Sequence, residues 1–274
     1  MDYRQNGVLK LYFYFLLIFL WCTKILSIFG LRLKPMKTNV LLTGCCLFFL
    51  IGCQKQEETP KVIYENKQET TEVSYQKIDS TEIKIADLPV KFIGTDYLLH
   101  PVGDVRVYNT GSSKYGSSKT NQVSYTISNY SNPEITGFIS NIMFQHKDSI
   151  TLEPLTTNRM EILSIAYLDE LALKSNRQLL VYTLVDMDTN RDGRYDSNDI
   201  KTLYLSKING TNFTKLAPDY HELLEWKIID DKLYFRTIED INKNGEFDSK
   251  DAVHYSFVNL INDEWIVEEY NPLN

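Results

Sequence analysis

One segment of this chain occurs twice, and the repeat limits the folds that the chain can adopt. The copies span residues 179–204 and 231–256, with the sequences LLVYTLVDMDTNRDGRYDSNDIKTLY and DKLYFRTIEDINKNGEFDSKDAVHYS. In each copy, twelve residues rich in Asp, Asn and Gly lie between segments rich in β-branched and aromatic residues. Such flanks are typical of strands. Each polar twelve-residue segment is therefore expected to join two antiparallel strands.

The two twelve-residue segments, residues 188–199 and 240–251, resemble EF-hand-type calcium loops. Both fit the pattern D-x-[DN]-x-[DN]-G-x-x-D-x-x-D. Calcium takes six to eight oxygen ligands, and short acidic or amide side chains at alternate positions can supply them. The glycine permits the sharp turn of the loop. The resemblance implies calcium as cofactor, with these ligands: Asp188, Asn190, Asp192, the Arg194 carbonyl, Asp196 and Asp199, then Asp240, Asn242, Asn244, the Glu246 carbonyl, Asp248 and Asp251.

Two details refine this reading of the loops. Both end in Asp, as in dockerin-type and bacterial extracellular calcium loops, and strand-like flanks argue against a calmodulin-like helical switch. A register beginning at Asp186 would place Arg191 where the glycine belongs, so it is rejected. The alternative is a pair of turns that bind nothing, because Asn, Asp and Gly favour turns in any case.

The N-terminal part of the chain differs from the rest. A signal peptide is predicted at residues 36–52, where Met36-Lys37 precedes an apolar stretch that ends in Leu50-Ile51-Gly52-Cys53. This ending fits the lipobox of bacterial lipoproteins, so Cys53 is the predicted lipidation site. Residues 1–35 are interpreted as an extension from a misassigned start, with a membrane helix near residues 11–30 as the alternative.

Residues 53–82 are predicted to be a flexible acidic tether, because they contain few apolar residues. Their opening, QKQEE, resembles the export signal of surface lipoproteins of Bacteroidota-type bacteria. The predicted location is therefore the outer membrane, on its outer surface or its periplasmic face, with the lipid anchor as the membrane contact.

Charge and cysteine usage agree with an address in the cell envelope. The chain has 29 basic and 36 acidic residues. Removing residues 1–52, which hold six basic residues and one acidic residue, leaves 23 and 35, a net charge of −12. Such a balance argues against a nucleic-acid partner. All four cysteines lie in the first 53 residues, so the predicted domain has no internal disulfide and no thiol nucleophile.

Residues 83–274 are predicted to form an all-β domain. Short apolar and aromatic segments recur every 8–15 residues with turn signals between them, and only residues 169–176 look helical. The run TLYLSKINGTNFTKLAPDYHELLEWKII resembles the passage between blades of TolB-like β-propellers. The resemblance implies antiparallel four-stranded sheets arranged as an incomplete propeller. Grouping the predicted strands in fours gives about three blades, which are few for a closed propeller. A β-sandwich of the same hairpins is therefore the alternative.

Two function classes remain open on the sequence. The resemblance favours a calcium-stabilised binding or scaffold lipoprotein, with a protein or a glycan as its ligand. The chain shows no nucleophile elbow, phosphate loop or H-E-x-x-H motif, and no two of its four histidines share a metal-binding spacing. No enzymatic activity is therefore predicted. The alternative is an envelope hydrolase whose catalytic groups meet only in the folded chain.

Overall fold

The computed structural model describes residues 60–64, 83–108 and 122–273. Within these ranges the chain forms short and medium β-strands and one helix. The strands are β1 (Lys84–Ala86), β2 (Tyr97–Asp104), β3 (Arg106–Tyr108), β4 (Gln122–Ser124), β5 (Ser128–Ser131), β6 (Glu134–Ile139), β7 (Asn141–His146), β8 (Glu153–Pro154), β9 (Glu161–Tyr167), β10 (Leu179–Val185), β11 (Thr202–Lys207), β12 (Thr214–Lys215), β13 (His221–Ile229), β14 (Lys232–Glu239), β15 (Ala252–Asn259) and β16 (Val267–Glu269), and the helix is α3 (Asp169–Ser175).

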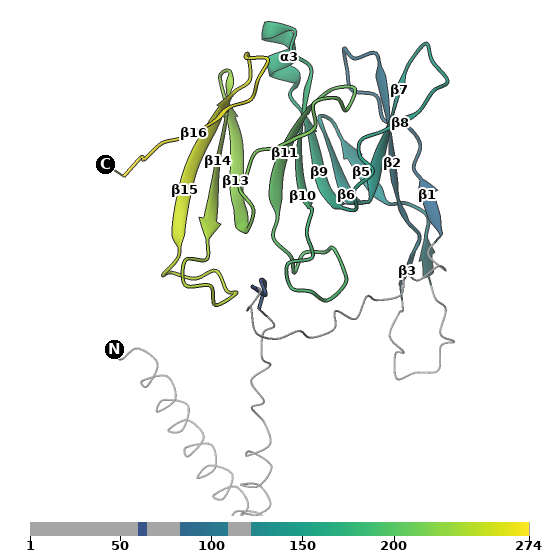
Figure 1. Cartoon of the computed structure of the whole chain (residues 1–274). Coiled ribbons are helices and arrows are strands. Elements are labelled where there is room, and N and C mark those ends of the chain that lie inside the picture. The colour runs from purple at the N-terminus through teal and green to yellow at the C-terminus, as the bar shows by residue number, and fades with distance from the viewer. Residues whose placement is uncertain (1–59, 65–82, 109–121, 274) are drawn as a thin grey trace, which may run out of the picture. The chain divides into compact units, whose positions relative to one another are not determined.

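These strands form three antiparallel sheets and a two-stranded ribbon. The first sheet has the order β1-β2-β7-β8, the middle sheet β12-β11-β10-β9-β6-β5, the third sheet β13-β14-β15-β16, and the ribbon β3-β4. The sheets lie side by side, with the middle sheet between the other two (Figure 1). Among the described strands, none of the sheets closes on itself. The predicted all-β antiparallel class is confirmed, whereas the propeller and the sandwich remain predictions.

The middle sheet is buried on both faces, because a separate hydrophobic cluster covers each one. On β10, Leu180, Tyr182 and Leu184 belong to the cluster shared with the first sheet. Leu179 and Val181 of the same strand belong to the cluster shared with the third sheet. Successive side chains of a strand point to opposite faces. A strand covered on both sides must therefore be apolar at nearly every position, which explains the run LLVYTLV.

Each copy of the repeat forms a β-hairpin. Strand β10 pairs with β11, and Val181 lies opposite Leu205. Strand β14 pairs with β15, and Phe235 lies opposite Ser256. In the described chain no helix borders either loop, so the prediction of antiparallel strands on both sides is confirmed. The hairpins belong to the middle and third sheets, and their loops lie at the same end of the domain (Figure 1).

The division of strands among the sheets differs from the prediction. The middle sheet has six strands, so the expectation of four-stranded sheets is wrong there. The segment TGFISNIMF (residues 136–144), which is strand-like by composition, divides at Ser140 into β6 of the middle sheet and β7 of the first. The Ser140 N–H donates to the Val102 carbonyl at 2.8 Å, which holds the chain where it crosses between sheets. Of the three sheets in the described part of the chain, only the third joins its strands in simple sequence order.

Helix α3 agrees with the helical segment predicted at residues 169–176, and Asn176 caps its C-terminus in the left-handed conformation. The predicted signal peptide, the extension before it and Cys53 lie outside the described residues. Among the described residues, no helix has the length and apolar character needed to cross a membrane.

Candidate functional site

The first loop of the repeat folds around the carboxylate of Asp188. The Gly193 N–H donates to its Oδ2 at 2.8 Å, and the Asp192 N–H donates to its Oδ1 at 3.1 Å. The backbone reaches this shape with φ values of +59° at Arg191 and +84° at Gly193. Glycine adopts such a φ at little cost because it lacks a Cβ. The glycine of the pattern is therefore where the turn needs it.

Asp199 closes the same loop. Its carboxylate accepts hydrogen bonds from the Thr189 N–H at 2.7 Å and the Asp196 N–H at 3.0 Å. The side chain is fully buried. Burial of a carboxylate is costly unless hydrogen bonds compensate it, and these donors provide that compensation. Because Thr189 follows Asp188 directly, the contact brings the first and last residues of the dozen together.

The second loop repeats these contacts. The Gly245 N–H donates to Asp240 Oδ2 at 2.7 Å, and the Asp248 N–H donates to Asp251 Oδ2 at 2.7 Å. Gly245 has a φ of +82°, close to that of its counterpart in the first loop. Asp240 is buried, with 2% of its surface exposed. The two loops share one conformation although their hairpins belong to different sheets.

In both loops the first two predicted ligand side chains converge on one backbone donor. The Asp192 N–H lies 3.1 Å from an Asp188 oxygen and 3.0 Å from the Asn190 side-chain oxygen. The Asn244 N–H lies 3.2 Å and 2.9 Å from the equivalent oxygens of Asp240 and Asn242. An ionised carboxylate has about four acceptor positions, so these groups retain capacity for a cation. An all-oxygen donor set of this kind fits calcium.

Asp186, which begins the rejected register, is engaged elsewhere. Its Oδ2 accepts hydrogen bonds from the Tyr204 hydroxyl at 2.8 Å and from the Lys215 ammonium at 2.6 Å. The two partners lie beyond the loop, on β11 and on the edge strand β12. Asp186 therefore connects the end of β10 to β11 and to the edge strand β12, and it is not part of the convergent oxygen set.

Residues 60–64, which we call the strap, run between the two loops. The N–H groups of Lys61 and Val62 both donate to the Gly245 carbonyl, at 2.8 and 3.2 Å. The Ile63 N–H donates to the Thr189 carbonyl at 2.8 Å. The strap therefore bonds to the second loop and then to the first, and it lies beside both loops in Figure 1. These five residues belong to the predicted tether, and the structure gives them fixed contacts.

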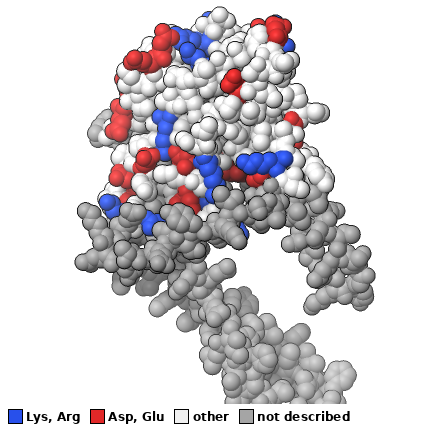
Figure 2. Space-filling model, turned by 45° about the vertical axis from the view of Figure 1, so that its right-hand side comes forward, with Lys and Arg blue, Asp and Glu red and all other residues white. Residues whose placement is uncertain are grey.

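Side chains of the strap add polar contacts on either side. Burial, together with a hydrogen bond to Asp240, raises the pKa of Tyr64 to about 12. Lys61 and Lys201 both pair with the nearly buried Glu222, at 2.9 and 3.3 Å. Charged side chains of both signs are interspersed on the face in view in Figure 2.

Thr189 connects the strap to the first loop, and its hydroxyl should be important for stability. Its Oγ1 donates to the Lys61 carbonyl at 2.9 Å and accepts from the Ile200 N–H at 3.1 Å, and the residue is 4% exposed. Thr189→Val removes both bonds, and a longer contact of the hydroxyl with Asp199 Oδ1 at 3.2 Å, with little change of shape. The expected loss is about 2 kcal/mol, or roughly 4–8 °C in melting temperature for a domain of this size, measured by circular dichroism.

Thr202→Val is the matched control. Thr202 is as deeply buried, with 1% exposed, but its hydroxyl has no hydrogen-bond partner among the described residues. Replacing an unpartnered buried hydroxyl with a methyl group should be neutral or stabilising. Equal losses in the two variants would contradict the role assigned to the Thr189 hydroxyl.

A pocket of about 780 Å³ opens beside the second loop. Its walls come from the strap, from Asp219 and Tyr220, and from the facing ends of β13 and β14. The Tyr64 and Tyr220 rings lie 5.8 Å apart between centroids. The pocket therefore combines aromatic rings with charged groups next to the loop.

The same region holds a group of side chains that sequence reasoning missed. His221, Glu239 and His254 lie together, although the two histidines are 33 positions apart in the sequence. Burial, and then the nearby His254, lower the pKa of His221. The signal that could have found the group is the hairpin register, since His221 lies opposite Glu239.

Comparisons with protein-family models, with curated proteins and with solved structures find no match to this chain.

Proposed function

We propose that this chain is an outer-membrane lipoprotein with a calcium-stabilised β domain that serves as a binding module of the cell envelope. The observation that carries the calcium proposal is the shared geometry of the two loops. In each loop the glycine N–H donates to the carboxylate of the first aspartate, Asp188 or Asp240, and the last aspartate accepts from the N–H of the ninth residue. Two unrelated turns that bind nothing would not be expected to repeat this arrangement in two different sheets.

Charge repulsion gives calcium its expected effect. The first loop contains four carboxylates, from Asp188, Asp192, Asp196 and Asp199, and the second contains three. Like charges held this close together destabilise the folded loop. A bound Ca²⁺ would cancel the repulsion and fix the hairpin ends. Because the strap contacts both loops, calcium binding would also stabilise the chain segment that leads toward Cys53.

The pocket beside the second loop is the surface that we assign to a ligand. Tyrosine rings can stack on sugars or on side chains of a protein, and Asp219 and Lys243 add charge of both signs to the pocket wall. These features support a protein or a glycan ligand. The histidine and glutamate side chains near this pocket are the one observation that favours the alternative, an enzyme of the envelope.

Calcium should raise the melting temperature of the full chain, purified in detergent, relative to a chelator. Extracellular calcium modules bind at ~10⁻⁴–10⁻³ M, and a ligand at 100 times its Kd adds about 2.7 kcal/mol per site. This corresponds to roughly 5–10 °C per occupied loop. Asp188→Ala should remove more of the calcium-dependent increase than Asp240→Ala, because the first loop has more carboxylates.

Two controls keep this experiment specific. Asp148→Ala removes a carboxylate from an exposed turn of the first sheet, so the full calcium effect should remain. Both loop variants will melt lower without metal, because each loses hydrogen bonds to the backbone, so the quantity compared is the calcium-dependent increase alone. Identical melts of the unaltered chain in calcium and in chelator would show that the loops are only turns.

A further inference from the structure

Three side chains with metal-ligating groups meet on the third sheet where its strands approach the second loop. His221 begins β13, Glu239 ends β14, and His254 is near the start of β15. The register places His221 opposite Glu239 and Thr237 opposite His254. Residues two apart on a strand share a face, so all of these side chains lie on one face of the sheet.

That face is the one that packs against the middle sheet. Leu233 and Phe235 precede Thr237 and Glu239 on the same side of β14, and both belong to the hydrophobic cluster between the sheets. The inward row of β14 therefore changes from apolar to polar as it nears the strap. The two imidazoles and the carboxylate are partly buried at the margin of the core and next to the pocket.

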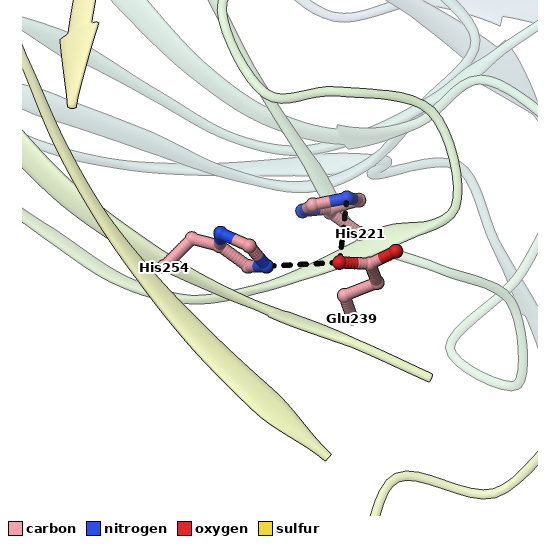
Figure 3. A group of neighbouring side chains, drawn as sticks. All are labelled: His221, Glu239 and His254. Atoms are coloured by element: carbon pink, nitrogen blue, oxygen red, sulfur yellow. Dashed lines mark hydrogen bonds and ion pairs between the residues drawn. The ribbon is translucent and has the colours of Figure 1, made fainter. Parts of the chain in front are cut away.

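The ligand atoms are close enough to share one ion. His254 Nε2 lies 3.0 Å from Glu239 Oε2, and His221 Nε2 lies 4.0 Å from the same oxygen. All three atoms lie within 4.8 Å of one another. Figure 3 shows one Glu239 oxygen joined to both rings by dashed lines. A tetrahedral Zn²⁺ with bonds of about 2.0–2.2 Å separates its ligands by about 3.4 Å, so small side-chain rotations would suffice.

A neighbouring hydroxyl orients one of the rings. His221 Nδ1 lies 3.3 Å from Thr237 Oγ1, and Thr237 is buried. A Nδ1–H that donates to this hydroxyl leaves the lone pair of Nε2 directed toward Glu239. Metal-binding histidines are commonly held in this way by a hydrogen bond at their second nitrogen.

We propose that His221, Glu239 and His254 bind a divalent transition-metal ion, Zn²⁺ in the first instance, at a site distinct from the two calcium loops. Imidazole nitrogen suits zinc and its neighbours in the periodic table, whereas calcium takes oxygen ligands. Three protein ligands leave a fourth position of a tetrahedral ion for water or another ligand. Because His221 and Glu239 also line the pocket, that position faces the candidate ligand surface.

Zinc binding to the full chain in detergent tests the proposal. The cysteines are alkylated first, since thiolates bind zinc, and excess Ca²⁺ occupies the oxygen sites. After removal of bound metal, Zn²⁺ is titrated by calorimetry and its stoichiometry measured by atomic absorption. One Zn²⁺ per chain is expected. Co²⁺ at the same site should give the visible absorption of a low-symmetry nitrogen and oxygen site, a readout that folding alone does not produce.

Variants separate this site from other histidines of the chain. His254→Gln should weaken zinc binding by more than about 100-fold, and Thr237→Val by about 10–100-fold, the usual effect of losing a partner of a metal ligand. His100→Gln, in the first sheet beside Gln145, should leave binding unchanged. Melting curves with chelator show whether each variant folds.

Two results would overturn the proposal. One is a calcium-saturated chain that takes up no zinc. The other is a folded His254→Gln variant that binds zinc as tightly as the unaltered chain. Neither result would affect the calcium proposal, because the loops are tested without zinc.

Discussion

Gly245→Ala is expected to detach the strap from the second loop and to destabilise the domain by about 3–4 kcal/mol. A Cβ at this position would lie 2.3 Å from the Val62 carbonyl oxygen and 2.8 Å from the Pro60 Cβ. The left-handed backbone adds about 1–2 kcal/mol of strain for a residue other than glycine. Loss of the two hydrogen bonds from Lys61 and Val62 adds about 1 kcal/mol each.

Two measurements report this change separately. Chemical denaturation gives the loss of stability, and limited trypsin digestion reports the strap. Cleavage after Lys61 should become much faster, because a protease must pull its target segment away from the protein surface. Mass spectrometry identifies that cut among cuts at other lysines of the tether.

Gly94→Ala is the matched control for backbone strain. Gly94 has a φ of +79°, almost that of Gly245, but a Cβ added there meets nothing within 4 Å. This variant should lose only the roughly 1–2 kcal/mol of the left-handed conformation, with cleavage after Lys61 unchanged. If the two variants lose equal stability and Lys61 stays protected in both, the close approach of the strap to Gly245 has no energetic role.

Cys53→Ser should abolish lipid labelling of the chain and block its processing. Acylation at the predicted lipobox cysteine is all or none, since serine offers no thiol to the lipid. Each buried methylene of an acyl chain contributes about 0.8 kcal/mol to membrane binding, so no change elsewhere in the chain should have a larger effect on anchoring. A palmitate analogue supplied to a bacterial host measures labelling, and a precursor that keeps residues 36–52 should accumulate.

Cys45→Ser is the control, because Leu42-Thr43-Gly44-Cys45 also fits the lipobox pattern but follows a shorter apolar stretch. This variant should remain labelled and processed. Loss of label in Cys45→Ser with label retained in Cys53→Ser would move the site to Cys45. An unaltered chain that carries no label would contradict the lipoprotein proposal.

The sequence predicted the two hairpins well because their determinants are local. The strands flanking each loop follow from β-branched and aromatic residues, and the turn follows from glycine at the sixth position. Asp188 and Gly193 form a hydrogen bond within one twelve-residue loop, so the loop's sequence pattern contains both partners. The same holds for Asp240 and Gly245. Local chemistry of this kind needs no knowledge of the remaining chain.

Long-range pairing was the part that the sequence could not supply. Residues 136–144 have continuous strand character, so composition alone does not show a break. The chain changes sheet at Ser140 because the residues after it pair with β2, where Asn141 lies opposite Val102 and the Ser140 N–H donates to the Val102 carbonyl. The strap is a stronger case, because Thr189 Oγ1 bonds to a carbonyl 128 positions away. Segment composition favoured a tether at residues 53–82, and a few backbone contacts are enough to fix five of those residues.

The histidine and glutamate group was missed for the same reason. Motif searches detect ligands at short spacing on one element, whereas His221, Glu239 and His254 come from three adjacent strands. Their meeting depends on the register of two hairpins, and a shift by one residue would turn each side chain to the other face. The search for metal sites in sheet proteins therefore has to follow the strand pairs.

The position of the strap also sets how the protein would stand on a membrane. Seven residue-to-residue steps lead from Cys53 to Pro60, where the described part of the chain begins. Fully extended, they span about 25 Å at most. With Cys53 acylated as proposed, so short a connection would keep the strap within about 25 Å of the lipid anchor. The pocket, which the strap lines, would then lie close enough to the headgroup layer to take ligands presented at the bilayer surface.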